Sequence, residues 1–417
     1  MQTSFDELYN RLVNAAVHDK LSREVKDVRQ SGNFDSHQLD CLLNPEKYPL
    51  IWSIGQCGCK DEEAACQRAC LFDAISRTEK GDIKIDNDKC TGCRVCVDSC
   101  KAKKLVDSKE ILPMLETINQ NKAPVYALIA PAFIGQFSDK VTPGKLRSAF
   151  KMLGFTGMVE VALFADILTL KEALEFDKNI NSEDDFLLTS CCCPIWIAML
   201  RKIYHEFMPH VPAAVSPMIA CGRSVKYLHP DAVTVFIGPC VAKKAEAKEK
   251  DICDAVDYVL TFQEIQDLFD FAEIKPEELS DDDRDHSSKG GRIYARTGGV
   301  SQAVKSTVEK LSPDRKIKLE AVQANGIPEC KKLLNEIREG NITANFIEGM
   351  GCIGGCVGGP KSIIDRTEGT AHVNAYGEKA VYQTPIENPY VIELLDRLGL
   401  ETVEKLLEQS DIFTREF

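Results

Sequence analysis

Apolar and polar positions follow two different patterns along the chain, and the change falls near residue 122. Before it, residues 1–50 carry apolar side chains at helical spacing and predict a polar, helical segment. After it, short apolar runs of strand length alternate with helical patterns. Buried strands separated by helices predict an α/β fold with mainly parallel sheets flanked by helices. The predicted strands are 124–129, 159–163, 186–189, 233–237, 258–261, 319–323 and 344–348.

Composition narrows the class of protein. The 417 residues are 44% hydrophobic and 28% charged, which is typical of a globular chain with two or three domains. No apolar run reaches the ~18 residues of a membrane span, and the first residues lack a signal-peptide pattern. A net charge of −13 argues against nucleic acid as a partner. We therefore expect a cytoplasmic protein with neither a nucleic-acid nor a membrane partner.

The chain contains eighteen cysteines, and disulfides are disfavoured in a reducing compartment. Metal binding, catalysis and ordinary burial remain, and clustering separates these uses. Eight cysteines lie within residues 57–100, three are consecutive at 191–193, and Cys352 and Cys356 lie in a glycine-rich stretch. The isolated cysteines are interpreted as small core residues; they are Cys41, Cys221, Cys253 and Cys330.

The cysteine-dense block has the spacing of a ferredoxin. Its second half is C-x2-C-x2-C-x3-C, which lets three thiolates converge on one [4Fe–4S] cubane. Zinc is the main alternative, but zinc ribbons use two separated pairs. The upstream half is less regular, and together the halves resemble a two-cluster bacterial ferredoxin domain. That resemblance implies crossed ligation, with Cys70, Cys90, Cys93 and Cys96 on one cluster and Cys57, Cys59, Cys66 and Cys100 on the other.

Three further cysteine motifs each begin where a predicted strand ends. They are TSCCCPIW at 189–196, GPCVAKKAE at 238–246 and EGMGCIGGCVGGP at 348–360. The segment around Pro131 has the same position after its own strand. Because ligand sites in parallel sheets gather beyond the carboxyl ends of strands, these four loops are predicted to surround one buried object.

The three motifs resemble the signature segments of [FeFe]-hydrogenases, and with the ferredoxin-like block the resemblance covers roughly residues 50–380. The family site is the H-cluster, a [4Fe–4S] cubane joined by a cysteine sulfur to a di-iron unit with CO, cyanide and dithiolate ligands. The helical segment predicted at 1–50 precedes the region of resemblance. The resemblance implies a small α+β ferredoxin-like domain with two [4Fe–4S] clusters at 51–110 and a two-lobed H-cluster domain at 111–417.

The same resemblance assigns residue roles by position. Lys243 would donate to a cyanide ligand, and Pro131 and Met350 would wall the pocket. Cys356 would bridge the cubane to the di-iron unit. The cubane ligands would be Cys193, Cys240, Cys352 and Cys356.

A proton relay is implied as well. If Pro194 and Trp196 fix the register of the triplet, Cys193 is the ligand, Cys192 is the relay thiol and Cys191 is extra. Glu172 and Glu175, three residues apart on one predicted helix face, would continue the relay. The alternative is that these two glutamates are merely solvated.

A second departure from the family pattern lies in the middle motif. Gly238 stands where the family usually has methionine, which predicts extra space beside the di-iron unit.

The implied activity is reversible formation of dihydrogen from two protons and two electrons, as in a ferredoxin-type [FeFe]-hydrogenase. Ferredoxin or another redox protein would supply the electrons, and maturation proteins would install the di-iron unit. Two alternatives remain open. One is a low-activity hydrogen sensor that passes its signal to a separate partner. The other is an iron–sulfur assembly protein carrying only cubanes, although the pocket residues Lys243 and Met350 count against it.

Overall fold

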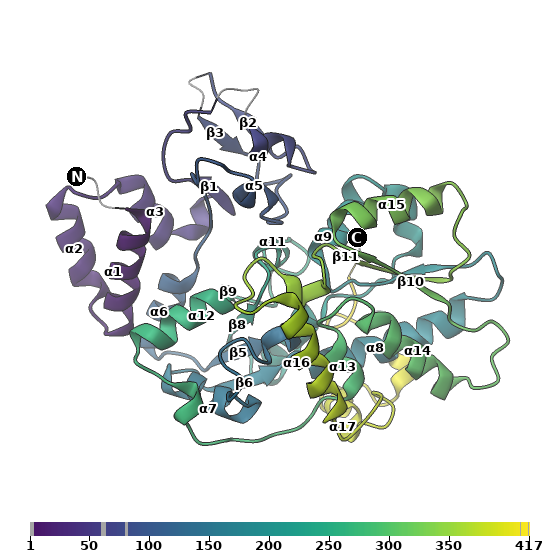
Figure 1. The fold of residues 1–417 in the computed structure, drawn as a ribbon. Helices are drawn as coiled ribbons and strands as arrows, with labels where there is room; N and C mark the ends of the chain where they lie inside the picture. The colour runs from purple at the N-terminus through teal and green to yellow at the C-terminus, as the bar shows by residue number, and fades with distance from the viewer. Residues whose placement is uncertain (1–3, 60–63, 80–81, 409, 416) are drawn as a thin grey trace.

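Two parallel sheets form the centre of the large part of the molecule (Figure 1). The computed structural model describes residues 4–59, 64–79, 82–408, 410–415 and 417. All neighbouring strands within both sheets are parallel, so the expected α/β class with two lobes is confirmed. One sheet has the order β6 (Gly157–Glu160), β5 (Val125–Ile129), β8 (Val233–Gly238) and β9 (Tyr258–Thr261), and the other has β10 (Ala321–Asn325), β11 (Phe346–Met350) and β7 (Leu187–Leu188).

Helices cover the sheets and join the lobes. The longest, α8 (Ala162–Asn179), packs against α10 (Pro217–Leu228) of the first lobe and α14 (Gly299–Leu311) of the second. Most of α8 is buried, including polar side chains, so it is an internal helix. It can therefore carry titratable groups into the interior between the lobes. Further helices of the large part include α7 (Pro143–Met152), α9 (Pro194–Lys202), α12 (Phe262–Phe271), α13 (Lys289–Ile293), α15 (Ile327–Arg338), α16 (Arg366–Glu378) and α17 (Pro389–Arg397).

Three strands are displaced by two or more residues from their predicted positions. The run predicted at 159–163 is divided between the end of β6 and the start of α8. Residues 161–163 are apolar because they begin a helix that packs in the interior, and not because they continue the strand. The strands predicted at 319–323 and 344–348 begin and end two residues later, as β10 and β11. Their parallel pairing, which aligns Asn325 with Met350, sets these ends.

The N-terminal segment is helical, as expected, with α1 (Phe5–Val17), α2 (Leu21–Ser31) and α3 (Ser36–Leu43). Helix α1 packs against α6 (Ile111–Gln120) and α12. The buried side chains of Phe5, Leu8 and Leu12 belong to the same apolar core as β5 and β8. This segment thus stabilises the outer side of the first lobe.

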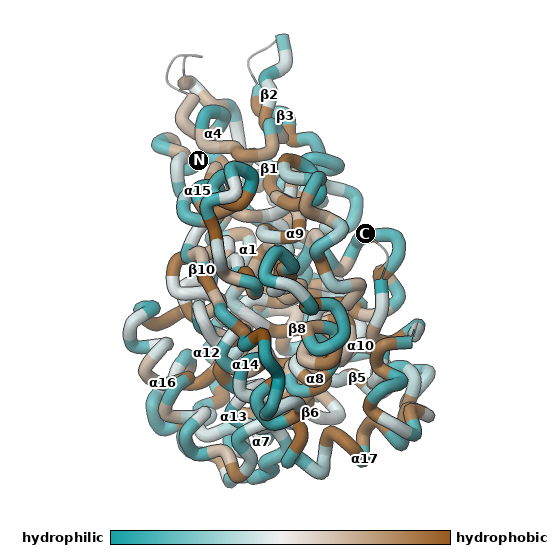
Figure 2. The backbone as a smooth tube through the Cα atoms, turned by 90° about the vertical axis from the view of Figure 1, so that its right-hand side faces the viewer, coloured by the Kyte–Doolittle hydropathy of each residue, from teal (hydrophilic) through white to brown (hydrophobic). Residues whose placement is uncertain are grey.

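The cysteine-dense unit contains two antiparallel strand pairs and two one-turn helices. The pairs are β1 (Ile51–Ser53) with β4 (Leu105–Asp107) and β2 (Ile75–Arg77) with β3 (Ile83–Ile85). Figures 1 and 2, two views turned by 90°, both place this unit at one end of the molecule. Within the described residues, no helix is long and apolar enough to cross a membrane. The two short helices are α4 (Ala65–Arg68) and α5 (Val95–Asp98).

Candidate metal centres

Four cysteines of the small unit surround one cavity. Cys70, Cys90, Cys93 and Cys96 all line it, together with apolar side chains of the strands. Burial, together with the charges of Cys93, Cys90 and Cys70, raises the pKa of the Cys96 thiol to about 12. Four thiolates that lie this close repel one another unless a cationic centre such as iron compensates them.

The other four cysteines of the small unit form a second group. Burial raises the pKa of Cys66, and the nearby thiolates of Cys100 and Cys57 add to the shift. A hydrogen bond with Cys57 raises the pKa of Cys59, and Cys100 contributes there as well. The structure therefore brings the eight cysteines into two groups with the crossed membership that the ferredoxin resemblance implies.

The two halves of the small unit repeat one local geometry. The backbone N–H of Ala74 donates to Cys70 Sγ at 3.3 Å, and that of Lys104 donates to Cys100 Sγ at 3.4 Å. In both cases the donor lies four residues after the thiol and follows a one-turn helix. N–H donors favour the thiolate over the thiol, so both positions suit metal-bound sulfur.

Four cysteines also converge in the large part of the molecule. Cys193 Sγ accepts a hydrogen bond from the Gly351 N–H at 3.3 Å, which joins the first and third motifs. Burial and the charge of nearby Cys193 together raise the pKa of Cys240 to about 11, and burial with the charges of Cys240 and Cys193 raises that of Cys356 to about 12. Burial also raises the pKa of Cys352, and the charges of Cys240, Cys193 and Cys356 contribute to that shift.

Each of these cysteines follows a strand. Cys193 caps α9 after β7, Cys240 lies between β8 and α11 (Ala242–Glu246), and Cys356 lies in η6 (Gly355–Gly358) after β11. The prediction that the strand ends meet around one site agrees with this placement. Gly355 has a φ of +82°, and a Cβ there would lie 2.7 Å from Thr297 N, so the turn at the third motif requires glycine.

A cavity of about 50 Å³ lies beside Cys356 and holds a few water-sized groups. Cys192, Lys243 and Pro131, which begins η3 (Pro131–Phe133), are among its lining residues. Met350 is also buried, but it lies in the core beside Cys192 and Cys193 and is not among the residues that line the cavity.

The expected space beside Gly238 is absent. A Cβ at Gly238 would lie 2.9 Å from the ring of Phe236 and 3.1 Å from Ala130 Cβ. Both Phe236 and Ala130 line the cavity next to Cys356. The interpretation that the glycine opens the pocket is therefore wrong, because a neighbouring aromatic ring occupies the volume of the missing side chain.

Lys243 is a buried cation at the edge of this cavity. Its Nζ lies 2.6 Å from Glu246 Oε2 and 3.2 Å from Ser216 Oγ. Burial lowers the pKa of Lys243, but the charge and hydrogen bond of Glu246 outweigh that effect and the pKa stays above its usual value. The cavity therefore has a permanent positive charge on one side, which suits an anionic ligand.

Glu172 lies in the interior of α8 and contacts the first motif. It accepts a short hydrogen bond from Thr189 Oγ1, and its Oε1 lies 3.7 Å from Cys191 Sγ. Burial raises the pKa of Glu172 from 4.5 to about 7, although the Thr189 hydrogen bond opposes the shift. Among the described residues, the thiol that contacts Glu172 is thus Cys191 and not Cys192. Sequence reasoning left Cys191 without a role; its only signal was the length of the triplet.

Glu175 lies nearer the surface on the same helix. Its Oε1 forms an ion pair with Lys171 at 2.8 Å, and Lys171 Nζ also donates to the Leu406 carbonyl at 2.9 Å. The charge of Glu175 contributes to the raised pKa of Glu172, so the two carboxylates are electrostatic neighbours. The alternative of two freely solvated glutamates does not describe this geometry, since Glu172 is 1% exposed.

Comparison with known proteins agrees with this arrangement. Residues 123–360 match the family model described as iron only hydrogenase large subunit, C-terminal domain. The chain is 29% identical over 275 residues to iron hydrogenase 1 of Clostridium pasteurianum, covering 56% of this chain and 48% of that protein. It thus spans about half the length of that relative.

Other matches widen the comparison. A probable cytosolic Fe-S cluster assembly factor of Drosophila melanogaster is 22% identical, over 69% of this chain and 75% of its own length. The solved structure of HydA(ΔEFG), which reports stepwise [FeFe]-hydrogenase H-cluster assembly, superposes with a TM-score of 0.61. That alignment has 24% identity and covers 71% of this chain and 94% of the other, so it establishes the shared fold.

Proposed function

The chain belongs to the iron-only hydrogenase large-subunit family, and from that premise we propose that it is an [FeFe]-hydrogenase that interconverts protons and dihydrogen. The observation that carries the proposal is the cavity shared by Cys356, Cys192, Lys243 and Pro131. A protein that binds only cubanes has no need for this cavity, which lies beside the four-cysteine group of the large part and is lined by a buried cation. Iron–sulfur cofactor use itself is supported by the family and by the grouped cysteines.

The residues present fit an H-cluster. Cys193, Cys240, Cys352 and Cys356 would hold its cubane, with Cys356, the one among them that lines the cavity, facing the di-iron side. When bound, this group would supply the redox chemistry that combines two electrons with two protons. The protein's own residues then have three tasks, which are to hold the group, to exclude water and to move protons.

Lys243 and the apolar wall carry out the first two tasks. The ammonium of Lys243 would donate to a cyanide ligand, and Glu246 keeps it charged. Pro131, Phe236 and Met218 line the same cavity and keep its dielectric low, which strengthens that interaction. Met350 would support this wall from the core behind Cys192.

The relay that we propose begins at Cys192, which lines the cavity, and leads to Glu172 and then Glu175. Cys191 Sγ lies 3.7 Å from Glu172 Oε1 and connects the triplet to α8. A carboxyl group with a pKa of about 7 can both accept and release a proton near neutral pH, which is what a relay requires.

Electrons would enter through two [4Fe–4S] clusters of the small unit, held by Cys70, Cys90, Cys93 and Cys96 and by Cys57, Cys59, Cys66 and Cys100. We propose ferredoxin or another one-electron carrier protein as the donor and maturation proteins as the source of the di-iron unit. The cytoplasmic location stays a prediction, supported by the word cytosolic in the name of the Drosophila relative.

The test is infrared spectroscopy of the purified chain after maturation, combined with measured hydrogen turnover. CO and cyanide bands together with turnover support the hydrogenase. The bands with very low turnover favour the hydrogen sensor. A protein that binds iron but has neither bands nor turnover would instead be a cubane-only assembly protein, the alternative suggested by the Drosophila relative.

A further inference from the structure

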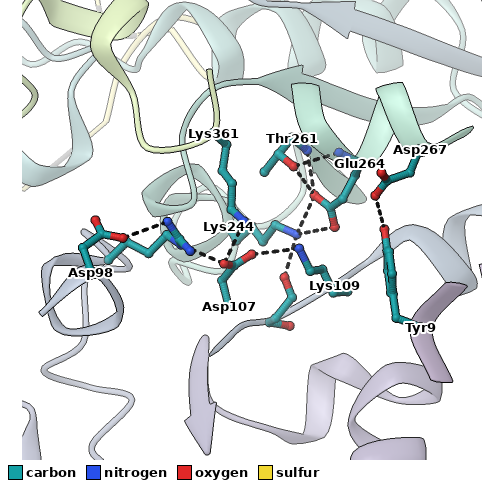
Figure 3. Close-up of polar contacts among 11 residues, drawn as sticks. Tyr9, Asp98, Asp107, Lys109, Lys244, Thr261, Glu264, Asp267 and Lys361 are labelled. Atoms are coloured by element: carbon teal, nitrogen blue, oxygen red, sulfur yellow. Dashed lines mark hydrogen bonds and ion pairs between the residues drawn. The ribbon is translucent and has the colours of Figure 1, made fainter. Parts of the chain in front are cut away.

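One buried carboxylate, Asp107, pairs with three cations, of which one is its near neighbour in the sequence and one lies far along the chain in the large part (Figure 3). Asp107 ends β4, and its side chain is 3% exposed. Its Oδ1 lies 2.8 Å from Arg94 Nε and 3.0 Å from Lys361 Nζ, and its Oδ2 lies 3.2 Å from Lys109 Nζ. A buried anion with three cationic partners is an unusual concentration of charge.

Two of these cations belong to loops that hold cysteines. Arg94 directly follows Cys93 in the ferredoxin-like run. Lys361 directly follows the third motif, and its backbone N–H donates to the Pro239 carbonyl at 3.0 Å, next to Cys240. Asp107 therefore connects the Cys93 loop of the small unit with the Cys240 and Cys356 loops of the large part.

A second set of contacts holds the same short segment from the other side. The fully buried Lys244 donates to the Ser108 carbonyl at 2.9 Å and pairs with Glu264 at 3.3 Å. Glu264 also forms the capping box of α12 with Thr261. Residues 107–109, which leave the small unit, are thus fixed between the second motif and the first lobe (Figure 3).

The loops connected in this way touch one another. A Cβ added to Gly92 would lie 3.1 Å from both Ala242 Cα and the Val241 carbonyl oxygen, just after Cys240. The charge of Cys93 contributes to the raised pKa of Cys352, so the two thiols are electrostatic neighbours. The four-cysteine cavity of the small unit and the four-cysteine group of the large part therefore meet at this junction.

Neighbouring charges shift the pKa values of the groups at the junction. Burial alone would raise the pKa of Asp107, but Lys109, Lys361, Arg94 and Lys244 together hold it well below its usual range. Burial and the charge of Lys109 lower the pKa of Lys361 to about 8, because it shares Asp107 with two other cations. Asp107 thus stays an anion, and Arg94 and Lys361 place two cations beside it, one next to each of the two cysteine groups.

We propose that Asp107 is a positioning residue for electron transfer: it fixes the 90–96 loop against the Cys240 and Cys356 loops, and Arg94 and Lys361 place positive charge between the two iron–sulfur sites. One electron at a time, taken from a reduced carrier protein, would cross this junction from the small unit to the large part. This inference rests on the proposed cluster ligation. It adds the residues that would set the distance between the two iron–sulfur sites and the reduction potential of the 90–96 cluster.

The experiment uses the full chain loaded with its clusters and compares Asp107→Asn with Lys361→Met. Removing the anion should raise the reduction potential of the 90–96 cluster, whereas removing the cation should lower it. We expect each change to alter the ratio of reduced to oxidised cluster by up to about tenfold, which is about 59 mV for one electron. Redox titration followed by electron paramagnetic resonance measures this, and both variants should accept electrons several-fold more slowly from reduced ferredoxin.

Asp98→Asn is the matched control. Asp98 pairs with the same Arg94 at 3.1 Å, but its side chain is 60% exposed, so solvent screens its charge. In Asp98→Asn, the reduction potential of the 90–96 cluster and the rate of electron uptake from reduced ferredoxin should match those of the wild type. Lys361→Arg keeps the charge and should restore the wild-type potential, which keeps the inference testable even if Asp107→Asn does not fold.

Three results would overturn the inference. The first is wild-type potentials and rates in both Lys361→Met and a folded Asp107→Asn. The second is shifts of the same sign in those two variants, which would indicate general loosening. The third is a wild-type chain that binds no clusters, and this would overturn the proposed function at the same time. If the wild type and both variants bind all their clusters and the reduction potentials are unchanged, the role of Asp107 is overturned and the proposed function is not.

Discussion

The small unit and the large part both gather cysteines, but they do so over different distances along the chain. In the small unit, Cys90, Cys93 and Cys96 come from one short loop, and Cys70 joins them from the preceding half. In the large part, Cys193, Cys240, Cys352 and Cys356 come from three loops that are separated by whole βα units. The first grouping depends on local spacing and the second on the assembly of two sheets.

This difference shows where each site is vulnerable. A local loop keeps its thiols together as long as its own turns form, and it tolerates changes elsewhere. A site assembled from strand ends depends on helix and sheet packing far from the metal. The small unit also has little apolar core of its own, whereas the large site lies beside the main core.

The largest expected effect separates the two regions directly. Cys352→Ala should abolish hydrogen turnover and the CO and cyanide bands, because it would remove one of the proposed ligands of the assembled site. Cys96→Ala should keep those bands and lose electron uptake from reduced ferredoxin. Infrared spectra and iron content distinguish the two variants. Cys253→Ala, at an exposed cysteine, serves as the control; equal loss of bands in all three would contradict the division.

The proton relay should show the next largest effect. Cys192→Ala should lower turnover by about 10²- to 10⁴-fold while the infrared bands remain, since a positioned proton donor contributes that much. Cys191→Ala should also lower turnover, because Cys191 Sγ lies 3.7 Å from Glu172 Oε1. Turnover at the wild-type rate in Cys192→Ala would refute its assignment as the relay thiol.

Glycine substitutions sharpen the comparison through stability. A Cβ at Gly349 would lie 2.1 Å from the Trp196 ring, so Gly349→Ala should lower the free energy of unfolding by about 1–3 kcal/mol. At Gly58 of the small unit, none of the described residues places a heavy atom within 4 Å of such a Cβ, so Gly58→Ala should change stability little. Urea denaturation measures both, and similar losses would show that the two regions are equally tightly packed.

The smallest expected effect is a pH dependence from Glu172. Burial raises its pKa from 4.5 to about 7, so the folded protein retains a proton there that the unfolded chain releases between these values. Its contribution to the free energy of unfolding is therefore largest below about pH 4.5 and is lost as the pH rises through about 7. Glu172→Gln should flatten this slope in denaturation measured across that range. An unchanged slope would show that another group causes it.

Local patterns predicted much of this molecule. The strands β5, β8 and β9 have ends within one residue of their apolar runs. The spacing of Cys90, Cys93 and Cys96 predicted a shared site, and all three line one cavity. Such features are readable because strand length, side-chain alternation and ligand spacing each depend on residues that are close in sequence.

Other features needed the assembled fold. The two-residue shift of β10 and β11 follows from their mutual register, and Phe236 rather than open space lies beside Gly238. The contact between Cys191 and Glu172 joins a loop to the interior of α8, and no spacing rule distinguishes Cys191 from Cys192.

The sequence by itself determined the cysteine groups, the parallel α/β class and the loops that carry the chemistry, because these depend on short-range spacing and on apolar periodicity. Only the tertiary structure decided which thiol contacts Glu172 and that Asp107 joins the two parts through Arg94 and Lys361. These are contacts between residues far apart in the chain. Their partners are fixed by packing and by the need to compensate buried charge, which no local pattern records.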